Sequence, residues 1–204
     1  MALPAGKLSL TYKDYLALEA ETGQRYEWLR GEAWMMAGGT LRHSAVKFNL
    51  AGELYVALRG RPCRAYDSDA KTRVDETDLS TYPDLSVVCG PVQRSPRDRH
   101  AATNPIVLIE VLSSGTERWD RGGKFHHYRH LNTLQNYVLV NPDEPRVEVF
   151  TRAGDGVWEL RVYEEGDRVV LPAIDITIDM EAIYADLPEE PDDEGEAPTQ
   201  PGSV

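Results

Sequence analysis

A single carboxylate inside an apolar run constrains the fold and function of this chain more than any other feature. Ile106 to Leu112 reads I-V-L-I-E-V-L, and its branched apolar side chains are typical of a strand buried on both faces. An ionised carboxylate taken out of water costs several kcal/mol unless it is paired or bound to a metal. We therefore interpret Glu110 as a site residue.

A second acid stands at the start of another run with strand character. Tyr82 to Cys89 reads Y-P-D-L-S-V-V-C, and Asp84 directly precedes its strand-forming part. Asp84 and Glu110 are 26 residues apart, which is enough for one strand, a loop and the next strand. Neighbouring strands would bring the two carboxylates side by side. Carboxylate oxygens gathered in this way suit Mg²⁺ or Mn²⁺.

A helix is predicted after the Glu110 strand, ending near Leu131. Asp120, Lys124 and Tyr128 follow one another at intervals of four residues, so a helix places them on one face. An exposed ion pair at this spacing contributes only a few tenths of a kcal/mol and is the structural alternative. Because the helix directly follows the Glu110 strand, it would position Lys124 to reach back over the two carboxylates. We therefore favour a role for Lys124 in the site.

The start of this helix carries conflicting signals. Ser113 to Thr116 is predicted to form a turn in which Ser114 or Thr116 caps the helix. Gly122 and Gly123 lower its helix propensity. An irregular first part is therefore expected.

These residues together resemble one family. Its pattern is matched by Pro83-Asp84, by Glu110-Val111-Leu112-Ser113, and by Asp120 with Lys124 and Tyr128. The pattern is similar to that of the Uma-two type family of restriction-endonuclease-like proteins, which belongs to the PD-(D/E)XK nuclease superfamily. The similarity runs from about Thr11 to about Ile183.

The resemblance implies a fold and a chemistry. The fold class is α/β: a restriction-endonuclease-like core, with a mixed central β-sheet flanked by helices and additional antiparallel strands. Asp84, Glu110 and the Val111 carbonyl would bind Mg²⁺ or Mn²⁺. Leu112 stands where the superfamily usually has lysine, and Lys124 would take that role from the following helix. The implied activity is metal-dependent hydrolysis of DNA phosphodiester bonds, with Asp120 and Tyr128 in support.

An earlier helix adds two further candidates. Positions 43–59 place Val46, Leu50, Leu54, Ala57 and Leu58 on one arc, and His43 falls on the same arc in the first turn. His43 could contact a phosphate or a metal-bound water, or it could be a capping or buried histidine. Glu53 lies at the edge of the arc and is a weaker site candidate, because a surface role suits it better.

The distribution of charge along the chain indicates whether the protein can bind nucleic acid. The net charge of −12 opposes nucleic-acid binding if taken over the whole chain, since phosphates are bound by Lys and Arg. Seven of the acids, however, lie between 186 and 196. Between 94 and 130 there are seven Lys and Arg, four acids and four histidines. In the loop from Gly90 to Asn104, the arginines predicted as phosphate contacts are Arg94, Arg97 and Arg99.

Length and composition indicate the domain organisation and the cellular location. The 204 residues, 41% hydrophobic and 27% charged, fit one domain over 1–187 and an acidic, proline-rich disordered tail over 188–204. Without a signal peptide or a long apolar run, we expect a cytoplasmic protein without a membrane contact. Cys63 and Cys89 are expected to be small buried residues. Apolar residues in the early and late strands favour a homodimer.

The other elements follow from local patterns. A helix is expected within 8–21, stopped by Gly23, and then a hairpin around Arg30-Gly31-Glu32. Two short strands are expected within 64–74, with Asp69 near the site. The later strands are predicted at 136–141, 146–150, 157–163 and 168–171, with a helical turn at 179–184.

Two other functions compete with the nuclease. A nuclease fold kept as a binding module with little catalysis is favoured by the displaced lysine and the acidic chain. A Ser/His hydrolase built on His43 with Ser44 or Ser113 lacks the G-x-S-x-G elbow and is disfavoured.

Overall fold

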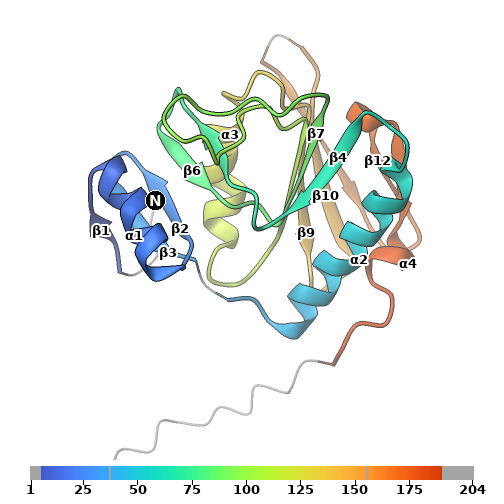
Figure 1. Cartoon of the computed structure of the whole chain (residues 1–204). Helices are drawn as coiled ribbons and strands as arrows, with labels where there is room; N and C mark the ends of the chain where they lie inside the picture. The colour runs from blue at the N-terminus through green and yellow to red at the C-terminus, as the bar shows by residue number, and fades with distance from the viewer. Residues whose placement is uncertain (1–5, 37, 155, 190–204) are drawn as a thin grey trace, which may run out of the picture.

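The computed structural model describes residues 6–36, 38–154 and 156–189. Only Pro188 and Glu189 of the predicted tail fall within them; the rest of it lies outside the described residues. A mixed six-stranded sheet forms the centre (Figure 1). Its order is β11-β10-β9-β8-β7-β4, and β8 and β9 are its one parallel pair in the described chain. The strands are β4 (Cys63–Asp67), β7 (Leu85–Cys89), β8 (Val107–Val111), β9 (Asn136–Asn141), β10 (Arg146–Arg152) and β11 (Trp158–Tyr163).

The register of β7 and β8 brings the two predicted acids together. The strands are antiparallel, and Leu85 lies opposite Ile109. Continued by one residue, this register places Asp84, which directly precedes β7, opposite Glu110. Opposed residues in an antiparallel pair point to the same face of the sheet. Asp84 and Glu110, 26 residues apart in the sequence, are therefore neighbours across the two strands.

Two helices and a hairpin cover one face of this sheet. Helix α2 (Leu41–Leu58) begins at Thr40, whose side chain accepts a hydrogen bond from the His43 amide. Its buried stripe is the one predicted from the periodicity: Val46, Leu50, Leu54 and Leu58. The stripe packs on odd-numbered residues of β7 and β8, together with β12 (Arg168–Leu171), β13 (Ile176–Asp179) and α4 (Met180–Ile183).

The opposite face carries the helix that follows β8. Even-numbered residues such as Leu108 and Leu112 pack here with Trp34, Trp119, Tyr128 and Tyr137. The predicted continuous helix is a π-helical segment η1 (Trp119–Lys124) followed by a short α3 (Phe125–Tyr128). The expected irregularity around Gly122 and Gly123 is therefore confirmed, and the predicted end near Leu131 is too late.

A second, five-stranded sheet stands beside this face (Figure 1). It consists of β1 (Leu8–Ser9), β2 (Tyr26–Leu29), β3 (Glu32–Met35), β5 (Thr72–Val74) and β6 (Leu79–Thr81). Helix α1 (Tyr12–Thr22) is capped by Thr11, and it stops at Gly23 as predicted. The predicted hairpin is β2 and β3, whose aromatic residues Trp28 and Trp34 are buried in the core.

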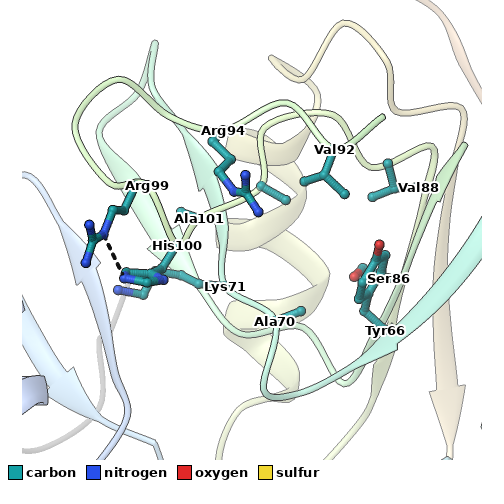
Figure 2. Close-up of a pocket in the computed structure, with 11 residues that line it drawn as sticks. Tyr66, Ala70, Lys71, Ser86, Val88, Val92, Arg94, Arg99, His100 and Ala101 are labelled. Carbon is teal, nitrogen blue, oxygen red and sulfur yellow. Dashed lines mark hydrogen bonds between the residues drawn. The ribbon is translucent and has the colours of Figure 1, made fainter. Parts of the chain in front are cut away.

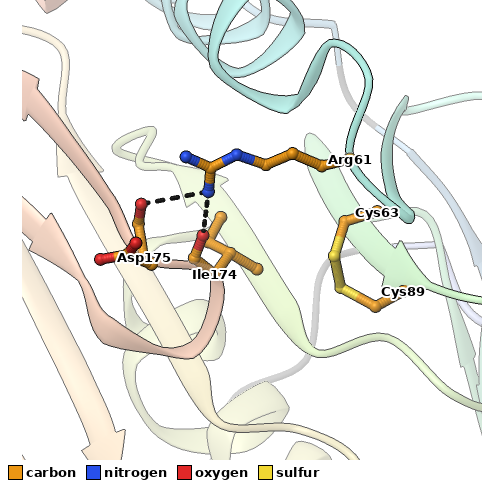
Figure 3. The surroundings of a disulfide bond; sticks show 5 residues. All are labelled: Arg61, Cys63, Cys89, Ile174 and Asp175. Carbon is orange, nitrogen blue, oxygen red and sulfur yellow. Dashed lines mark hydrogen bonds between the residues drawn. A yellow bond between two sulfur atoms is a disulfide. The ribbon is translucent and has the colours of Figure 1, made fainter.

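Cys63 and Cys89 are joined in a disulfide, so their interpretation as unpaired buried residues is wrong (Figure 3). They occupy opposite positions on β4 and β7, a pairing that only the strand register reveals. Both are partly buried. Nearby, Arg61 donates to the carbonyls of Ile174 and Asp175 at 2.8 and 3.2 Å. That contact ties the end of α2 to the turn before β13.

Candidate active site

Most of the predicted site residues line one cavity of about 310 Å³ at the end of β7 and β8. Its wall includes Asp84, Glu110 and Lys124, together with His43 and Asp120. These side chains come from four elements or their ends: α2, β7, β8 and η1. The structure therefore joins the two acids and the lysine as expected.

Glu110 is buried, with 4% of its side chain exposed. Its Oε1 accepts a hydrogen bond from the Tyr128 hydroxyl at 2.9 Å and lies 3.2 Å from Lys124 Nζ. Burial raises the pKa of Glu110 well above its usual value, and the negative charge of Asp120 adds to this, although Lys124 opposes it. A proton or an additional cation would therefore stabilise this carboxylate.

Lys124 Nζ is surrounded by three carboxylates. It lies 2.8 Å from Asp120 Oδ1, 3.0 Å from Glu27 Oε1 and 3.2 Å from Glu110 Oε1. Burial lowers the pKa of the amine, but the three acids outweigh burial and raise it well above the usual value. Lys124 is therefore a charged lysine, and the exposed ion pair considered as an alternative is excluded.

Asp84 is held by three groups from outside its own strand, one of which is Lys47, whose Nζ lies 3.7 Å from Asp84 Oδ1. Asp84 Oδ2 accepts the Val111 amide at 2.9 Å and lies 3.5 Å from His43 Nε2. Burial would raise the pKa of Asp84, but His43 and the Val111 amide lower it below its usual value. The carboxylate is thus ionised and oriented, with 15% of the side chain exposed to the cavity.

His43 bridges the helix and the metal-ligand candidates. Its Nε2 lies 2.9 Å from the Val111 carbonyl oxygen, and because a carbonyl only accepts, Nε2 carries the hydrogen. Burial lowers the pKa of His43, yet Asp84 raises it above its usual value. A carbonyl oxygen has two lone pairs, so one of them on Val111 remains for another ligand.

Glu27 is the site residue that sequence reasoning missed. It comes from β2 of the other sheet and is buried at 4% exposure. Its Oε2 accepts the indole N–H groups of Trp34 and Trp119 at 3.2 and 3.0 Å, and its Oε1 faces Lys124. The available signal was a charged residue between Tyr26 and Trp28 in a strand-like run, which is the argument that identified Glu110.

Two weaker candidates lie elsewhere. Glu53 is exposed on α2 and is not part of the cavity wall. Asp69 is also exposed and pairs with Arg25, so its expected approach to the site is wrong. Tyr128 does not line the cavity, but its hydroxyl, paired with Thr81 Oγ1 at 2.8 Å, supports Glu110 from behind.

The donor set suits a hard divalent cation. Within the described residues, no group of three or more His, Cys, Asp or Glu is arranged to hold a metal ion. Mg²⁺, however, commonly takes one or two carboxylates and keeps several waters. Asp84, Glu110 and the Val111 carbonyl offer such a set on one wall, where acids outnumber cationic groups. These residues fit the ion that the family resemblance implies.

The sheet order and the site define a restriction-endonuclease-like α/β protein. A solved structure with this fold, described as a putative nuclease belonging to DUF820 from Anabaena variabilis, superimposes with a TM-score of 0.65. The match covers 80% of this chain and 91% of that one at 21% identity.

The chain belongs to the Uma2 family, described as "putative restriction endonuclease", whose model matches residues 12–181. Two relatives from Synechocystis sp. are the uncharacterized proteins slr1290 and sll1609. The first is 34% identical over 87% of this chain and 93% of its own length. The second is 31% identical over 74% of this chain and 85% of its own length. In the described part of the chain, no helix has the length and hydropathy needed to cross a membrane.

Proposed function

We propose that this protein is an endonuclease that hydrolyses DNA phosphodiester bonds with the help of Mg²⁺ or Mn²⁺. The observation that carries the proposal is the convergence of Asp84, Glu110 and Lys124 on one cavity. Membership of the Uma2 family supports the same class of reaction.

The two acids and the strand carbonyl have the metal-binding role. Asp84, Glu110 and the Val111 carbonyl would hold the divalent cation. When bound, such an ion activates a water molecule and neutralises charge on the phosphate. His43 keeps the Asp84 carboxylate turned toward this position, since it contacts both Asp84 and the Val111 carbonyl.

Lys124 has the role of orienting the attacking water and stabilising the negative charge that develops on the phosphate. Asp120 and Glu27 also hold its ammonium group, at 2.8 and 3.0 Å. Tyr128 holds Glu110 by its hydroxyl. Groups that position a reacting side chain typically contribute about 10- to 100-fold in metal affinity or rate.

A binding module with little catalysis is the second candidate function. It is favoured by the three carboxylates around Lys124, because an ammonium group held by three acids is less available to a phosphate. The two candidates differ in whether the protein turns over DNA or only retains it.

Nicking of supercoiled plasmid distinguishes them. With Mg²⁺ or Mn²⁺ the parent protein should convert the supercoiled form, and Asp84→Asn or Glu110→Gln should lower the rate by at least about 100-fold. Glu181→Gln, an exposed acid on α4, is the matched control and should cut at the parental rate. If the two site variants cut as fast as the parent, the proposed site is wrong. DNA retention without cutting by the parent would favour the binding module.

A further inference from the structure

A second cavity, of about 230 Å³, lies beneath the loop from 91 to 104 (Figure 2). Its polar lining consists of basic side chains and hydroxyl groups: Lys71, Arg94, Arg99, His100, Tyr66 and Ser86. No Asp or Glu lines it, although the chain has a net charge of −12. Such a lining attracts an anion.

Two of its cations are free of acidic partners. In the described chain, no carboxylate pairs with Arg94 or Arg99; Arg99 Nε instead donates to His100 Nε2 at 3.1 Å. Lys71, in contrast, is neutralised by Glu19 and Asp98 at 2.6 and 2.9 Å. Figure 2 shows Arg94 extending from the loop toward the space between the loop and the wall formed by Tyr66 and Ser86. The charge available to a ligand is therefore that of the two arginines.

The wall opposite Arg94 carries two hydroxyl groups, those of Tyr66 and Ser86, that have no hydrogen-bond partner among the described residues. Ser86 is 4% exposed and lines the cavity, and its Oγ makes no hydrogen bond to another described residue. The Tyr66 hydroxyl likewise has no partner within the described ranges. Tyr66 is only partly buried, and both residues line the cavity, so their hydroxyl groups are open to a bound molecule. An oxyanion between these hydroxyls and the Arg94 guanidinium would accept hydrogen bonds from both walls.

The loop that forms the roof is fixed, which makes the cavity a formed site. The Ala102 amide donates to the Lys71 carbonyl, and the Arg73 amide donates to the Ala102 carbonyl, both at 2.8 Å. Arg97, the third arginine predicted to contact phosphate, is held by Asp78 at 2.9 Å instead. Arg94 and Arg99 are thus presented by a loop tied to β5.

The position relative to the active site fits a substrate strand. Ser86 lies two residues beyond Asp84 along β7, which corresponds to about 7 Å at roughly 3.3 Å per residue. We infer that this cavity binds a backbone phosphate of the DNA strand close to the bond that is cut. The inference rests on the proposed function for its substrate.

Binding without divalent cation tests the subsite separately from catalysis. A labelled 12-nucleotide single strand and the corresponding duplex are titrated in EDTA, with fluorescence anisotropy as the readout. Arg94→Gln combined with Arg99→Gln should weaken binding about tenfold and reduce the salt dependence by one to two phosphate contacts. Ser86→Ala should weaken binding about two- to fivefold. Arg161→Gln on β11, away from the cavity lining, is the matched control and should bind as the parent does.

Competition identifies the source of the phosphate. A strand subsite predicts that inorganic phosphate and a mononucleotide compete only weakly, at millimolar concentration. Tight, arginine-dependent binding of either one, with oligonucleotide binding unchanged in the double variant, would overturn the subsite in favour of a small-molecule pocket. The subsite is also overturned if the double variant keeps the parental melting temperature and binds the oligonucleotide as tightly as the parent does. The same holds if the parent binds neither the single strand nor the duplex.

The two proposals fail in different ways. A parent protein that binds DNA through Arg94 and Arg99 but never nicks plasmid would retain the subsite and remove the endonuclease. A parent that nicks plasmid, with cleavage and binding both insensitive to the two arginines, would retain the endonuclease and remove the subsite.

Discussion

At the scale of single residues, buried charge was the most informative signal in the sequence. Glu110 could be identified because no apolar strand tolerates an unpaired carboxylate, and the structure supplies Lys124 and Tyr128 as its partners. The same signal at Glu27 was missed, because the aromatic residues on either side of it suggested a hairpin packed in the core or at an interface. Two of its three partners, Trp119 and Lys124, lie 92 and 97 residues away, and no local pattern gives such contacts.

His127 provides a pH-dependent prediction at this scale. It is buried on α3, and its Nδ1 has no hydrogen-bond partner among the described residues. Burial, with the nearby His126 and Arg30, lowers the pKa of His127 from 6.5 to about 4. Between these values the unfolded chain takes up a proton that the folded chain does not. The free energy of unfolding should therefore fall as the pH drops from 6.5 to 4, by about 3 kcal/mol from this residue.

Urea unfolding at several pH values measures this contribution. His127→Gln removes the titrating group, so its stability should depend less on pH in that interval than that of the parent. His126→Gln, a neighbouring histidine with a more accessible ring, is the comparison and should keep most of the parental slope. Parallel pH profiles for the parent and His127→Gln would contradict the assignment.

At the scale of elements, the sequence predicted the strands better than the helix after β8. The periodicities placed β9, β10, β11 and β12 within about two residues of their observed limits. The π-helical segment was not predicted as such, because its conformation depends on Trp119 turning back over Gly123 to reach Glu27. β13 was also missed, since its pairing with β12 is set by the turn at Asp175, which has a positive φ of 50°.

Gly123 should be essential in this segment, whereas Gly122 should not. A Cβ at Gly123 would lie 1.8 Å from Trp119 Cε3, whereas one at Gly122 meets nothing within 4 Å. Gly123→Ala should destabilise the protein by about 1 to 3 kcal/mol and displace the indole that binds Glu27. Gly122→Ala should be neutral or stabilise by up to about 1 kcal/mol. Denaturant unfolding of both variants tests this, and equal stability of the two would contradict it.

At the scale of the whole molecule, the site lies where two sheets meet. The central sheet supplies Asp84 and Glu110, and the five-stranded sheet supplies Glu27. The family resemblance predicted the first sheet correctly, but the sequence did not predict that the N-terminal hairpin completes the site. The expected single domain over 1–187 stays a prediction. So does the homodimer: the hairpin residues Trp28 and Trp34 are buried, while Val157 and Leu160 near β11 are exposed.

Titration calorimetry with Mn²⁺ tests most directly whether two acids from adjacent strands act as one cation site. If the two acids form one site, the parent should bind Mn²⁺, and Asp84→Asn and Glu110→Gln should each weaken binding at least about tenfold. All three proteins keep the acidic stretch 186–196, so binding there cancels in the comparison. Mn²⁺ affinities that are equal in the parent and in both folded variants would contradict the account.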